Sequence, residues 1–335
     1  MKHEANTPLT DQFGRVHNYL RISLTERCNL RCTYCMPAEG IVLRPKAHFM
    51  KTEEVLSIAE TFVRLGVSKI RLTGGEPLVR NDAKAVMQGL SKLPVELAIS
   101  SNGVLVDQFI ETFKTCGIQS INISLDSLQE NTFNNITRRN DFQKIKSNID
   151  LLIQEKFHVK LNAVIIKGVN DQEIIDFINF TKHQNIHYRF IEFMPFNGNR
   201  WDWSKGLGYA EMLQTIETAF PGQVIKLQDK KNDTSKAFQI KGYQGTFAII
   251  STVTNPFCDT CNRLRLTADG KIKNCLFSSS ETDLLTALRE GKSIEQIIRE
   301  SVWHKKSVRG GMTHFDDFSN TELNQQNRNM ISIGG

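Results

Sequence analysis

The sequence lacks any long hydrophobic run. No apolar stretch approaches the roughly 18 residues that a membrane-spanning helix needs, and the first residues contain no apolar core of the kind found in a secretory signal. Apolar residues make up 40% of the 335 residues and charged residues 23%, an ordinary globular composition. We therefore expect neither a membrane protein, a secreted protein nor a disordered chain, but a cytoplasmic protein with no membrane partner.

A dense basic run and a dinucleotide fingerprint are also missing. Lys and Arg number 42 against 36 for Asp and Glu, a net charge of +6 at pH 7 that suits an anionic substrate. Because no basic run and no aromatic stacking platform stands out, nucleic acid is not expected as a partner. The absence of Gly-x-Gly-x-x-Gly disfavours a Rossmann-type dinucleotide fold.

Short strand patterns alternate with longer helical patterns along most of the chain. This alternation predicts a parallel sheet, and six such units favour a complete or partial barrel. The predicted strands cover residues 19–24, 69–73, 96–100, 120–125, 158–166 and 187–193, and the predicted helices lie near 53–65, 82–92, 105–115, 141–155, 172–183 and 209–219.

The composition changes along the chain and predicts three regions. We expect a loose polar tail over 1–17, a barrel over 18–227 and a C-terminal region over 228–335. Polar residues 228–245 are interpreted as a linker and an exposed hairpin. Further strands are predicted near 246–251 and 263–267, and helices near 282–290 and 294–302.

One face of the predicted strands is largely polar. Parallel strands covered by helices on both faces should be apolar on both, and an unpaired buried polar group costs about 1–3 kcal/mol. The pattern therefore indicates a barrel interior that is wet or filled by a polar ligand. The alternative is that some of these residues lie in loops beyond the strand ends. The polar positions are Arg21, Ser23, Arg71, Thr73, Ser100, Asn102, Asn122, Ser124, Asp126, Lys160 and Asn162.

Six of the seven cysteines fall into two groups of three. Cys28, Cys32 and Cys35 form C-x3-C-x2-C directly after the first predicted strand. Three thiolates this close suit a cubic iron–sulfur cluster with one iron left open to a substrate. A structural zinc ion is the alternative, but it needs a fourth ligand, and no Cys or His lies between residues 36 and 47.

The second group, Cys258, Cys261 and Cys275, has the spacing C-x2-C-x13-C, again without an adjacent fourth ligand. A second open cluster is preferred over a zinc site completed by a histidine from far along the chain. Arg263 and Arg265 adjoin this group on one strand face and suit a phosphate or a purine edge, unless they are two solvated arginines. The seventh cysteine, at position 116, matches neither group and is expected to be a buried thiol.

The first cysteine motif, with Tyr34 before its last cysteine, resembles the radical S-adenosylmethionine superfamily. Thr73-Gly74-Gly75-Glu76-Pro77, after the second predicted strand, is similar to the GGEP segment of that superfamily. The resemblance implies that the open iron chelates S-adenosylmethionine and that the GGEP backbone receives its methionine amino group. Glycine permits the close approach that this requires.

Both cysteine groups, their order and the last residues together resemble one family within that superfamily, the GTP 3′,8-cyclases of molybdenum cofactor biosynthesis (protein A). The resemblance runs from about Asn18 to Gly335 and implies an incomplete (β/α)6 TIM-like barrel of the radical SAM type, with a C-terminal region that closes the open side. Its marks are the segments at 21–37, 70–77, 121–126, 189–194, 257–277 and 333–335.

The resemblance also implies which residues act. Cys28, Cys32 and Cys35 would hold one 4Fe-4S cluster, and Cys258, Cys261 and Cys275 a second cluster whose open iron binds guanine. Tyr34, Gly75, Ser124 and Met194 would contact S-adenosylmethionine, and Gly334 and Gly335 would take part in catalysis. Arg21, Arg71, Ser100, Lys160, Arg263, Leu264 and Arg265 would contact GTP.

The reaction implied is the cyclisation of GTP. A 5′-deoxyadenosyl radical takes the ribose 3′ hydrogen, the 3′ carbon radical bonds to C8 of guanine, and reduction of the cyclised radical by one electron and a proton then gives 3′,8-cyclo-7,8-dihydro-GTP. The implied partners are a reducing electron donor such as flavodoxin or ferredoxin and, as the next enzyme, cyclic pyranopterin monophosphate synthase. The oligomeric state stays open, with a homodimer as one option. Two alternatives remain, another radical enzyme such as a peptide modifier with auxiliary clusters, and a non-enzymatic protein with structural metal.

Overall fold

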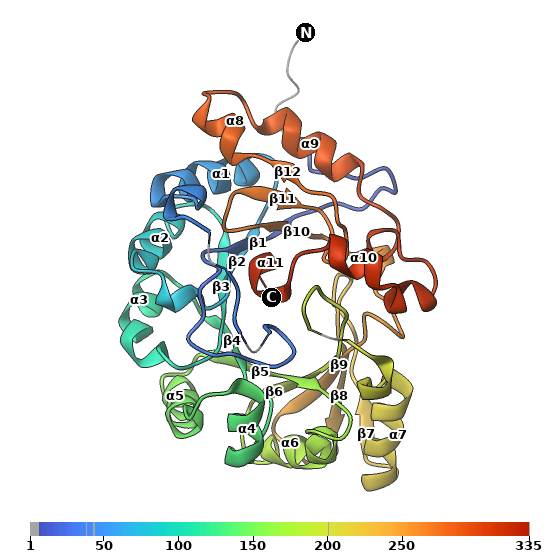
Figure 1. The fold of residues 1–335 in the computed structure, drawn as a ribbon. Coiled ribbons are helices and arrows are strands. Elements are labelled where there is room, and N and C mark those ends of the chain that lie inside the picture. Colours follow the sequence, from blue (N-terminus) through green and yellow to red (C-terminus); the bar gives the residue numbers. More distant parts are fainter. Residues whose placement is uncertain (1–6, 38, 43, 200, 335) are drawn as a thin grey trace.

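The structure is a computed structural model that describes residues 7–37, 39–42, 44–199 and 201–334. These residues form one 12-stranded sheet in the order β12-β11-β10-β1-β2-β3-β4-β5-β6-β9-β8-β7 (Figure 1). The strands are β1 Tyr19–Ser23, β2 Lys69–Thr73, β3 Glu96–Ser101, β4 Ser120–Ser124, β5 His158–Ile165, β6 His187–Glu192, β7 Val224–Lys226, β8 Lys236–Ile240, β9 Thr246–Ile250, β10 Arg263–Leu266, β11 Lys271–Lys273 and β12 Thr282–Asp283.

The parallel part of the sheet runs from β10 through β1–β6 to β9. The six strands predicted for the barrel are confirmed, and β9 and β10 extend the parallel run at both ends. Antiparallel β7 and β8 form one edge, and β11 and β12 form the other. Since β12 and β7 are not neighbours in the strand order, the barrel is open in the described part of the chain, which confirms the incomplete barrel.

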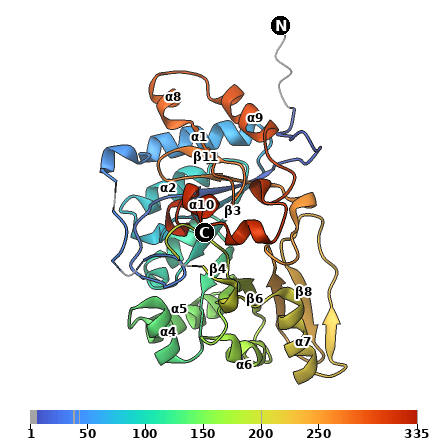
Figure 2. The same ribbon diagram turned by 45° about the vertical axis from the view of Figure 1, so that its right-hand side comes forward.

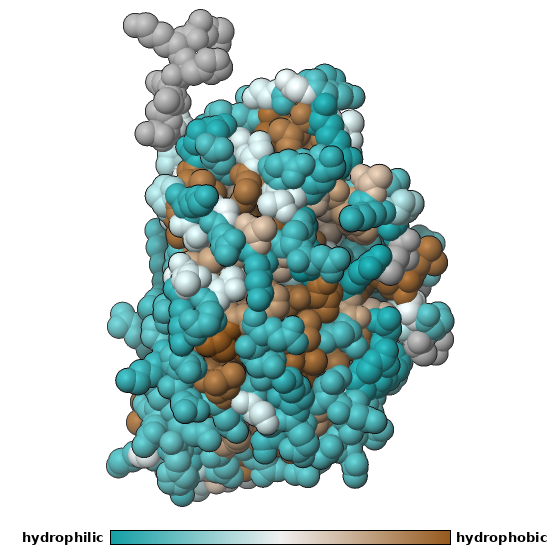
Figure 3. Space-filling model, turned by 90° about the vertical axis from the view of Figure 1, so that its left-hand side faces the viewer, coloured by the Kyte–Doolittle hydropathy of each residue, from teal (hydrophilic) through white to brown (hydrophobic). Residues whose placement is uncertain are grey.

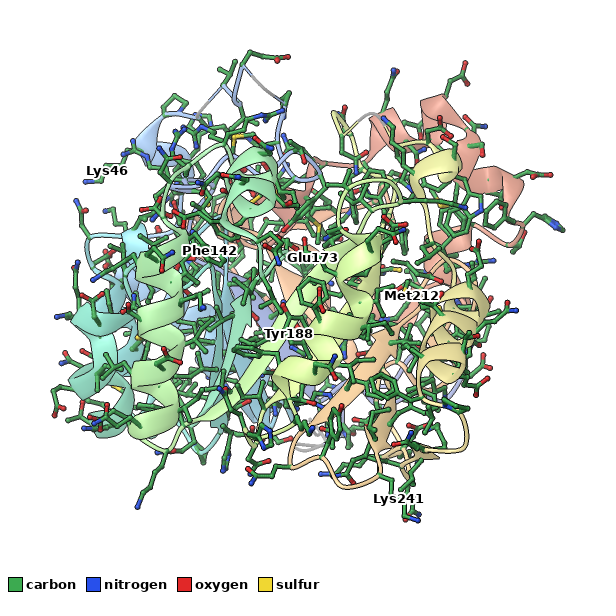
Figure 4. The ribbon with its side chains drawn as sticks, turned by 90° about the horizontal axis from the view of Figure 1, so that it is seen from below. Lys46, Phe142, Glu173, Tyr188, Met212 and Lys241 are labelled. Carbon is green, nitrogen blue, oxygen red and sulfur yellow. The ribbon has the colours of Figure 1, made fainter. Side chains whose placement is uncertain are left out.

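Helices cover the outer side of the curved sheet. In α1, Val55, Ile58, Ala59 and Phe62 are buried, which is the spacing that places side chains on one helix face toward the sheet. Figure 4 shows the helices along one side of the molecule from below. The helices are α1 Thr52–Arg64, α2 Ala83–Leu90, α3 Ile110–Thr115, α4 Glu130–Thr137, α5 Phe142–Gln154, α6 Ile174–Phe180, α7 Tyr209–Ala219, α8 Leu285–Arg289, α9 Glu295–Trp303, α10 Thr321–Gln326 and α11 Met330–Ile333.

The N-terminal part of the described chain is more ordered than the sequence predicts. Residues 1–17 were expected to be loose, yet Leu9, Asp11 and His17 are buried, and Thr10 forms a bridge with Val16. The reason is that this segment turns back on itself, with the His17 N–H donating to the Leu9 carbonyl over 2.7 Å. Residues 1–6 lie outside the described part.

The polar stretch 228–245 also differs from a simple linker. Its strand β8 pairs with β9, and Phe238 and Ile240 are buried beneath the hairpin. Residues 230–235 line the central cavity described below. Strands β7 and β8, on either side of the predicted boundary between 227 and 228, pair in the same sheet. The boundary itself stays a prediction.

The C-terminal segment folds over the inner side of the sheet. The C-terminal end and α11 lie within the ring of strands in Figure 1, and α10 lies in front of the sheet in Figure 2. A second small core, separate from the main one, holds this segment through Phe196, Phe277, Met312, Phe318 and Ile333. The C-terminal region therefore covers the cavity from the side where the parallel strands end.

No helix among the described residues combines the length and the apolarity needed to cross a bilayer. The face drawn in Figure 3 is mostly hydrophilic, with hydrophobic side chains showing between polar ones near its middle.

Candidate active site

The inner side of the sheet encloses one cavity of about 700 Å³. It is lined by the polar strand face predicted from alternation, by all six cysteines of the two groups, and by part of the C-terminal segment. The predicted lined interior is thus confirmed. Asn102 and Asp126 lie just beyond their strand ends, and both still line the cavity.

The cavity wall is strongly cationic. The cations that line it from the strands are Arg21, Lys69, Arg71, Lys160, Arg189, Arg263 and Arg265, and Lys230, Lys231, Lys305 and Arg309 line it from other segments. Burial, followed by the charges of Arg189 and Arg71, lowers the pKa of Lys160 to about 8. Burial, followed by the charge of Arg71, lowers the pKa of Arg189 to about 9. These shifts mean that the cations repel one another and that an anion bound among them would be stabilised.

The positive charges of the cavity wall also change the pKa of the Tyr19 phenol. Burial alone would raise the pKa of its phenol, but the charges of Arg71, Arg21 and Arg263 outweigh burial and lower that pKa to about 7. Arg71 also donates from Nε to the Tyr19 hydroxyl over 2.7 Å. The cations of the wall therefore favour the phenolate form of Tyr19.

Some lining groups are engaged within the wall. Arg71 donates to the Ile99 carbonyl over 2.6 Å and to the Ser120 hydroxyl over 3.2 Å, so its donors are largely committed. Among the residues that line the cavity, the buried polar atoms without a hydrogen-bond partner in the described part of the chain include Arg189 Nε, Arg263 Nε, Asn122 Oδ1 and Asn162 Oδ1. Because such orphaned groups are costly, the wall fits a polar ligand.

Several cavity residues escaped the sequence analysis. Arg189 lies on β6 and continues the alternation of the predicted strand 187–193, so the polar-face argument could have included it. Tyr19 stands two residues before Arg21 on the same strand face, as the period of two requires. Leu264, predicted to contact GTP, has a fully buried side chain in the main core, so a ligand contact at this position would come from its backbone.

The first cysteine loop follows β1 and is held by α4, a helix that the sequence analysis missed. The Arg31 and Thr33 N–H groups donate to the Thr137 and Ile136 carbonyls, each over 2.9 Å. The Arg138 guanidinium, next after the helix, donates to the carbonyls of Arg31 and Met36. The end of α4 therefore fixes the backbone that carries Cys28, Cys32 and Cys35.

The GGEP segment after β2 packs closely against the same loop. Gly75 donates its N–H to the Thr25 carbonyl over 2.6 Å, and a Cβ at this position would meet the Arg27 carbonyl oxygen at 2.3 Å. Only glycine allows this approach. Glu76 is buried and accepts from the Ser101 hydroxyl and the Asn102 N–H, while burial raises its pKa to about 7.

Tyr34 joins the cysteine loop to the far side of the cavity. Its hydroxyl donates to Asp126 Oδ2 over 2.8 Å, and Asp126 Oδ1 accepts from the Val164 N–H over 2.8 Å. Burial raises the pKa of Asp126 to about 6. Gly75, Ser124 and Tyr34, three of the positions predicted to contact S-adenosylmethionine, line the cavity together with the fourth, Met194.

The donor set of the first loop fits an iron–sulfur cluster. Burial raises the pKa of Cys28 to about 11 and that of Cys35 to about 12, so strong cations are needed to hold these groups as thiolates. A single zinc ion would need each sulfur about 2.3 Å away, whereas a cluster binds each thiolate through a different iron.

The second cysteine group faces the same cavity from the C-terminal region. The Arg309 N–H lies 3.4 Å from Cys258 Sγ, and Lys305 Nζ lies 3.6 Å from Cys261 Sγ. Burial opposes the charge of Cys261, but the positive charges of Lys305 and Arg263, together with hydrogen bonds from the Arg263 N–H and the Lys305 ammonium, outweigh it and lower the pKa of this thiol. Burial instead raises the pKa of Cys258, so the surroundings favour a thiolate at Cys261 and oppose one at Cys258.

The C-terminal tail reaches the cavity wall. The Gly334 carbonyl accepts from Arg265 Nη1 over 2.8 Å. Gly334 has φ of +83°, and a Cβ there would meet Thr73 Oγ1 at 2.7 Å and Ser23 Cβ at 2.8 Å. Glycine is thus required both by conformation and by space. Gly335, also predicted to be catalytic, lies outside the described residues.

Comparison with known proteins agrees with this arrangement. The profile described as "Radical SAM superfamily" matches residues 22–181, and that described as "Molybdenum Cofactor Synthesis C" matches residues 186–310. The crystal structure of Streptococcus suis SuiB bound to S-adenosylmethionine covers 94% of this chain with 77% of its own, at a TM-score of 0.62 and 13% identity. That likeness concerns the fold. Fold and cysteine loop together define a member of the radical SAM superfamily.

Proteins that are similar in sequence identify the family within this superfamily. The chain is 45% identical over 333 residues to GTP 3′,8-cyclase, mitochondrial, of Arabidopsis thaliana, covering 98% of this chain and 83% of that protein. It is 46% identical over 305 residues to molybdenum cofactor biosynthesis protein moc-5 of Caenorhabditis elegans, covering 90% of this chain and 51% of that protein. The chain belongs to the family of these molybdenum cofactor biosynthesis proteins. It spans about half the length of several of them.

Proposed function

We propose that this protein is a radical SAM enzyme that cyclises GTP to 3′,8-cyclo-7,8-dihydro-GTP in molybdenum cofactor biosynthesis. The observation that carries the proposal is the cavity that both cysteine groups share, with cations from β1, β2, β5, β6 and β10 on its wall. The names of the relatives support GTP as substrate.

The described residues fit two 4Fe-4S clusters and S-adenosylmethionine. We assign the first cluster to Cys28, Cys32 and Cys35 and the second to the cysteines at 258, 261 and 275. When bound and reduced, the first cluster would supply the electron for cleavage of S-adenosylmethionine into methionine and a 5′-deoxyadenosyl radical, and this chemistry would remove the ribose 3′ hydrogen. All other requirements fall on the protein chain, which must position the reactants and exclude water.

The cations of the cavity would bind the triphosphate. GTP carries about four negative charges, and buried guanidinium and ammonium groups form strong charge-assisted hydrogen bonds to phosphate. Arg21, Arg71 and Arg265 lie at one register level of β1, β2 and β10. On β5 and β6, Lys160 lies opposite His187 and Arg189 lies opposite Asn162, so Lys160 and Arg189 are diagonal neighbours. The triphosphate would thus be held between two parts of the barrel wall that β3 and β4 separate.

The tail would complete the site beside the ribose. Gly334 packs against Ser23 and Thr73 at the ends of β1 and β2, and its carbonyl accepts from Arg265. In that position the tail would exclude water from the reacting atoms, and the backbone of Gly334 would hold a hydrogen-bonding group near the substrate.

The remaining partners extend the proposal. The enzyme needs a low-potential electron donor, such as flavodoxin or ferredoxin, and its product is consumed by cyclic pyranopterin monophosphate synthase. None of the seven cysteines, all of which lie in the described part of the chain, forms a disulfide, which agrees with a reducing compartment such as the cytoplasm. The oligomeric state, including a homodimer, stays open.

An anaerobic assay tests the proposed function. Reconstituted and reduced protein is incubated with S-adenosylmethionine and either GTP or ATP, and 5′-deoxyadenosine and the nucleotide product are measured by mass spectrometry. We expect a cyclised product from GTP and none from ATP. Formation of 5′-deoxyadenosine without any change in GTP would retain the radical chemistry and reject the substrate.

Two cysteine variants provide matched controls for this assay. Cys116→Ala removes a thiol that is buried in the main core, away from the cavity, and should leave the product yield within a factor of two. Cys258→Ala should abolish cyclised GTP while S-adenosylmethionine cleavage persists. Equal yields from the two variants would contradict the assigned role of the second group.

A further inference from the structure

Residues 9–17 form a compact N-terminal segment that we call the clasp, and we propose that its Arg15 is a positioning residue for the second iron–sulfur cluster. The inference rests on the proposed function, because it concerns the cluster assigned to Cys258, Cys261 and Cys275. It goes beyond that assignment by giving a role to a segment that contributes no residue to the cavity wall.

Arg15 ties the second cysteine loop to a distant segment of the chain. Its Nη1 donates to the Cys258 carbonyl over 2.8 Å and to the Ser307 carbonyl over 2.7 Å, and its Nη2 donates to the Lys306 carbonyl over 2.8 Å. The side chain is only 8% exposed. One buried guanidinium therefore fixes the backbone of a cluster ligand relative to residues 306–307.

The clasp holds Arg15 in the orientation that these contacts need. Asp11 Oδ2 accepts from Arg15 Nε over 2.7 Å and from the His17 ring over 2.9 Å. Asp11 Oδ1 accepts from the N–H groups of Phe13 and Arg15. A guanidinium held by a carboxylate at Nε has its two terminal nitrogens free to bind carbonyls in a fixed plane.

The segment that Arg15 anchors also contacts the cluster ligands. Lys305 Nζ lies 3.6 Å from Cys261 Sγ and donates to the carbonyls of Arg263 and Asn274. The Arg309 N–H lies 3.4 Å from Cys258 Sγ. Hydrogen bonds to cluster sulfurs set their basicity and the stability of the site. Arg15 therefore acts through residues 305–309 as well as through Cys258 itself.

The clasp serves one cluster and not the other. All three carbonyls that accept from Arg15 belong to the second cysteine loop or to residues 306–307. The first loop is instead held by α4 and Arg138. Loss of Arg15 should consequently loosen the second cluster and leave the first intact.

The test compares Arg15→Met with Arg289→Met in the full chain carrying both clusters. Arg289 is a matched control, because it also binds a carboxylate, Glu54, and two backbone carbonyls, at Ala47 and Phe49, away from both cysteine groups. Release of iron to a chelator is followed anaerobically, and the remaining cluster is examined by electron paramagnetic resonance with and without S-adenosylmethionine.

We expect Arg15→Met to release about half of its iron at least tenfold faster than the wild type. The remaining half should keep wild-type kinetics and a resonance that still changes when S-adenosylmethionine is added. Arg289→Met should behave as the wild type. Equal acceleration of both halves, or none, would overturn the role of Arg15.

A second variant covers the case in which Arg15→Met does not fold. Arg15→Lys keeps the charge but has a single nitrogen for three carbonyls, so it should give an intermediate rate for the same half of the iron. A wild-type rate for this variant would overturn the proposal. If the wild type itself bound only one cluster, both the proposed function and the role of Arg15 would be rejected. If the wild type bound two clusters and the Arg15 variants behaved as the wild type, only the role of Arg15 would be rejected.

Discussion

Lys160 is an ammonium group placed among guanidinium groups. Burial, followed by the charges of Arg189 and Arg71, lowers its pKa to about 8. A bound triphosphate would stabilise the charged form and raise this pKa. GTP therefore binds best when the Lys160 ammonium is protonated. The affinity for GTP is highest at pH values below the lowered pKa and falls as the pH rises through it.

The first prediction is a pH dependence of GTP binding. Between pH 7 and pH 9, we expect the affinity to fall about tenfold, because the protonated fraction of a group with a pKa near 8 falls by that factor. Equilibrium dialysis of GTP in the absence of S-adenosylmethionine measures this. Lys160→Arg, whose charge persists at pH 9, should flatten the dependence.

Tyr19 requires a control, because its pKa of about 7 would bring a negative charge into the same wall over the same range. Tyr19→Phe removes that charge and keeps the ring. If the decline in affinity persisted unchanged in Lys160→Arg and vanished in Tyr19→Phe, the phenol rather than the ammonium would be the titrating group.

At this scale the sequence predicted much of the site. Alternation alone placed Arg21, Ser100 and Lys160 on one inner face, and the structure confirms it. It could not predict that the donors of Arg71 are engaged with Ile99 and Ser120, since this depends on how neighbouring strands are registered. The burial of Cys116 was predicted and is confirmed.

At the scale of elements, the C-terminal tail is held by one buried arginine. Arg328 donates to both carboxylate oxygens of Asp269, over 2.8 and 2.9 Å, and to both of Glu281, each over 2.6 Å. It also lies 3.7 Å from Glu26 in the first cysteine loop. The tail is thus attached to both cysteine regions a few residues before Gly334.

The second prediction concerns this attachment. Arg328→Met removes the cation that Asp269 and Glu281 share and leaves Asp269 with Arg44 and Glu281 with Lys273 at 3.9 Å, so it weakens a partly buried ion-pair network. We expect the tail to detach and kcat to fall by more than about tenfold. The iron content should stay at about the wild-type level of two full clusters. Steady-state kinetics and iron analysis measure both.

Two further variants make this prediction specific. Gln325→Ala, at an exposed position of α10, should leave kcat unchanged. A chain that ends at Ile333 should keep both clusters and lose cyclisation, as should Arg328→Met if the two act through the same tail. Full activity of the shortened chain would show that the terminal glycines are dispensable.

Helix α4 was the main element that the sequence did not predict. Its residues, rich in Asn and Thr, have low helix propensity, so the periodic pattern is weak. The helix forms because Phe133 and Ile136 are buried and its last carbonyls accept from the cysteine loop. Tertiary contacts therefore decide this element, and these contacts are invisible in a local pattern.

At the scale of the whole molecule, two strands far along the chain complete the sheet. β10 pairs in parallel with β1, with Tyr19 opposite Arg263, and β9 pairs with β6. The strands near 246–251 and 263–267 were predicted, but not their partners, because pairing between such distant segments leaves no local signal. This pairing is what brings the second cysteine group to the cavity of the first.

The pairing of β10 with β1 and of β9 with β6 also brings many cations into one cavity. The third prediction follows from this concentration of positive charge. Mutual repulsion of the cavity cations destabilises the folded molecule, so an anion that binds there should stabilise it. Tripolyphosphate at 100 times its Kd would contribute about 2.7 kcal/mol, which for a chain of this size raises Tm by about 5 °C. Anaerobic thermal unfolding of the cluster-loaded protein measures the shift.

Citrate, which is anionic but differs in shape, should raise Tm by a smaller amount. Arg189→Met should remove most of the shift because its Nε is buried without a partner among the described residues, whereas Lys241→Met, at an exposed turn, should retain it. An equal shift in both variants would mean that the anion binds outside the cavity.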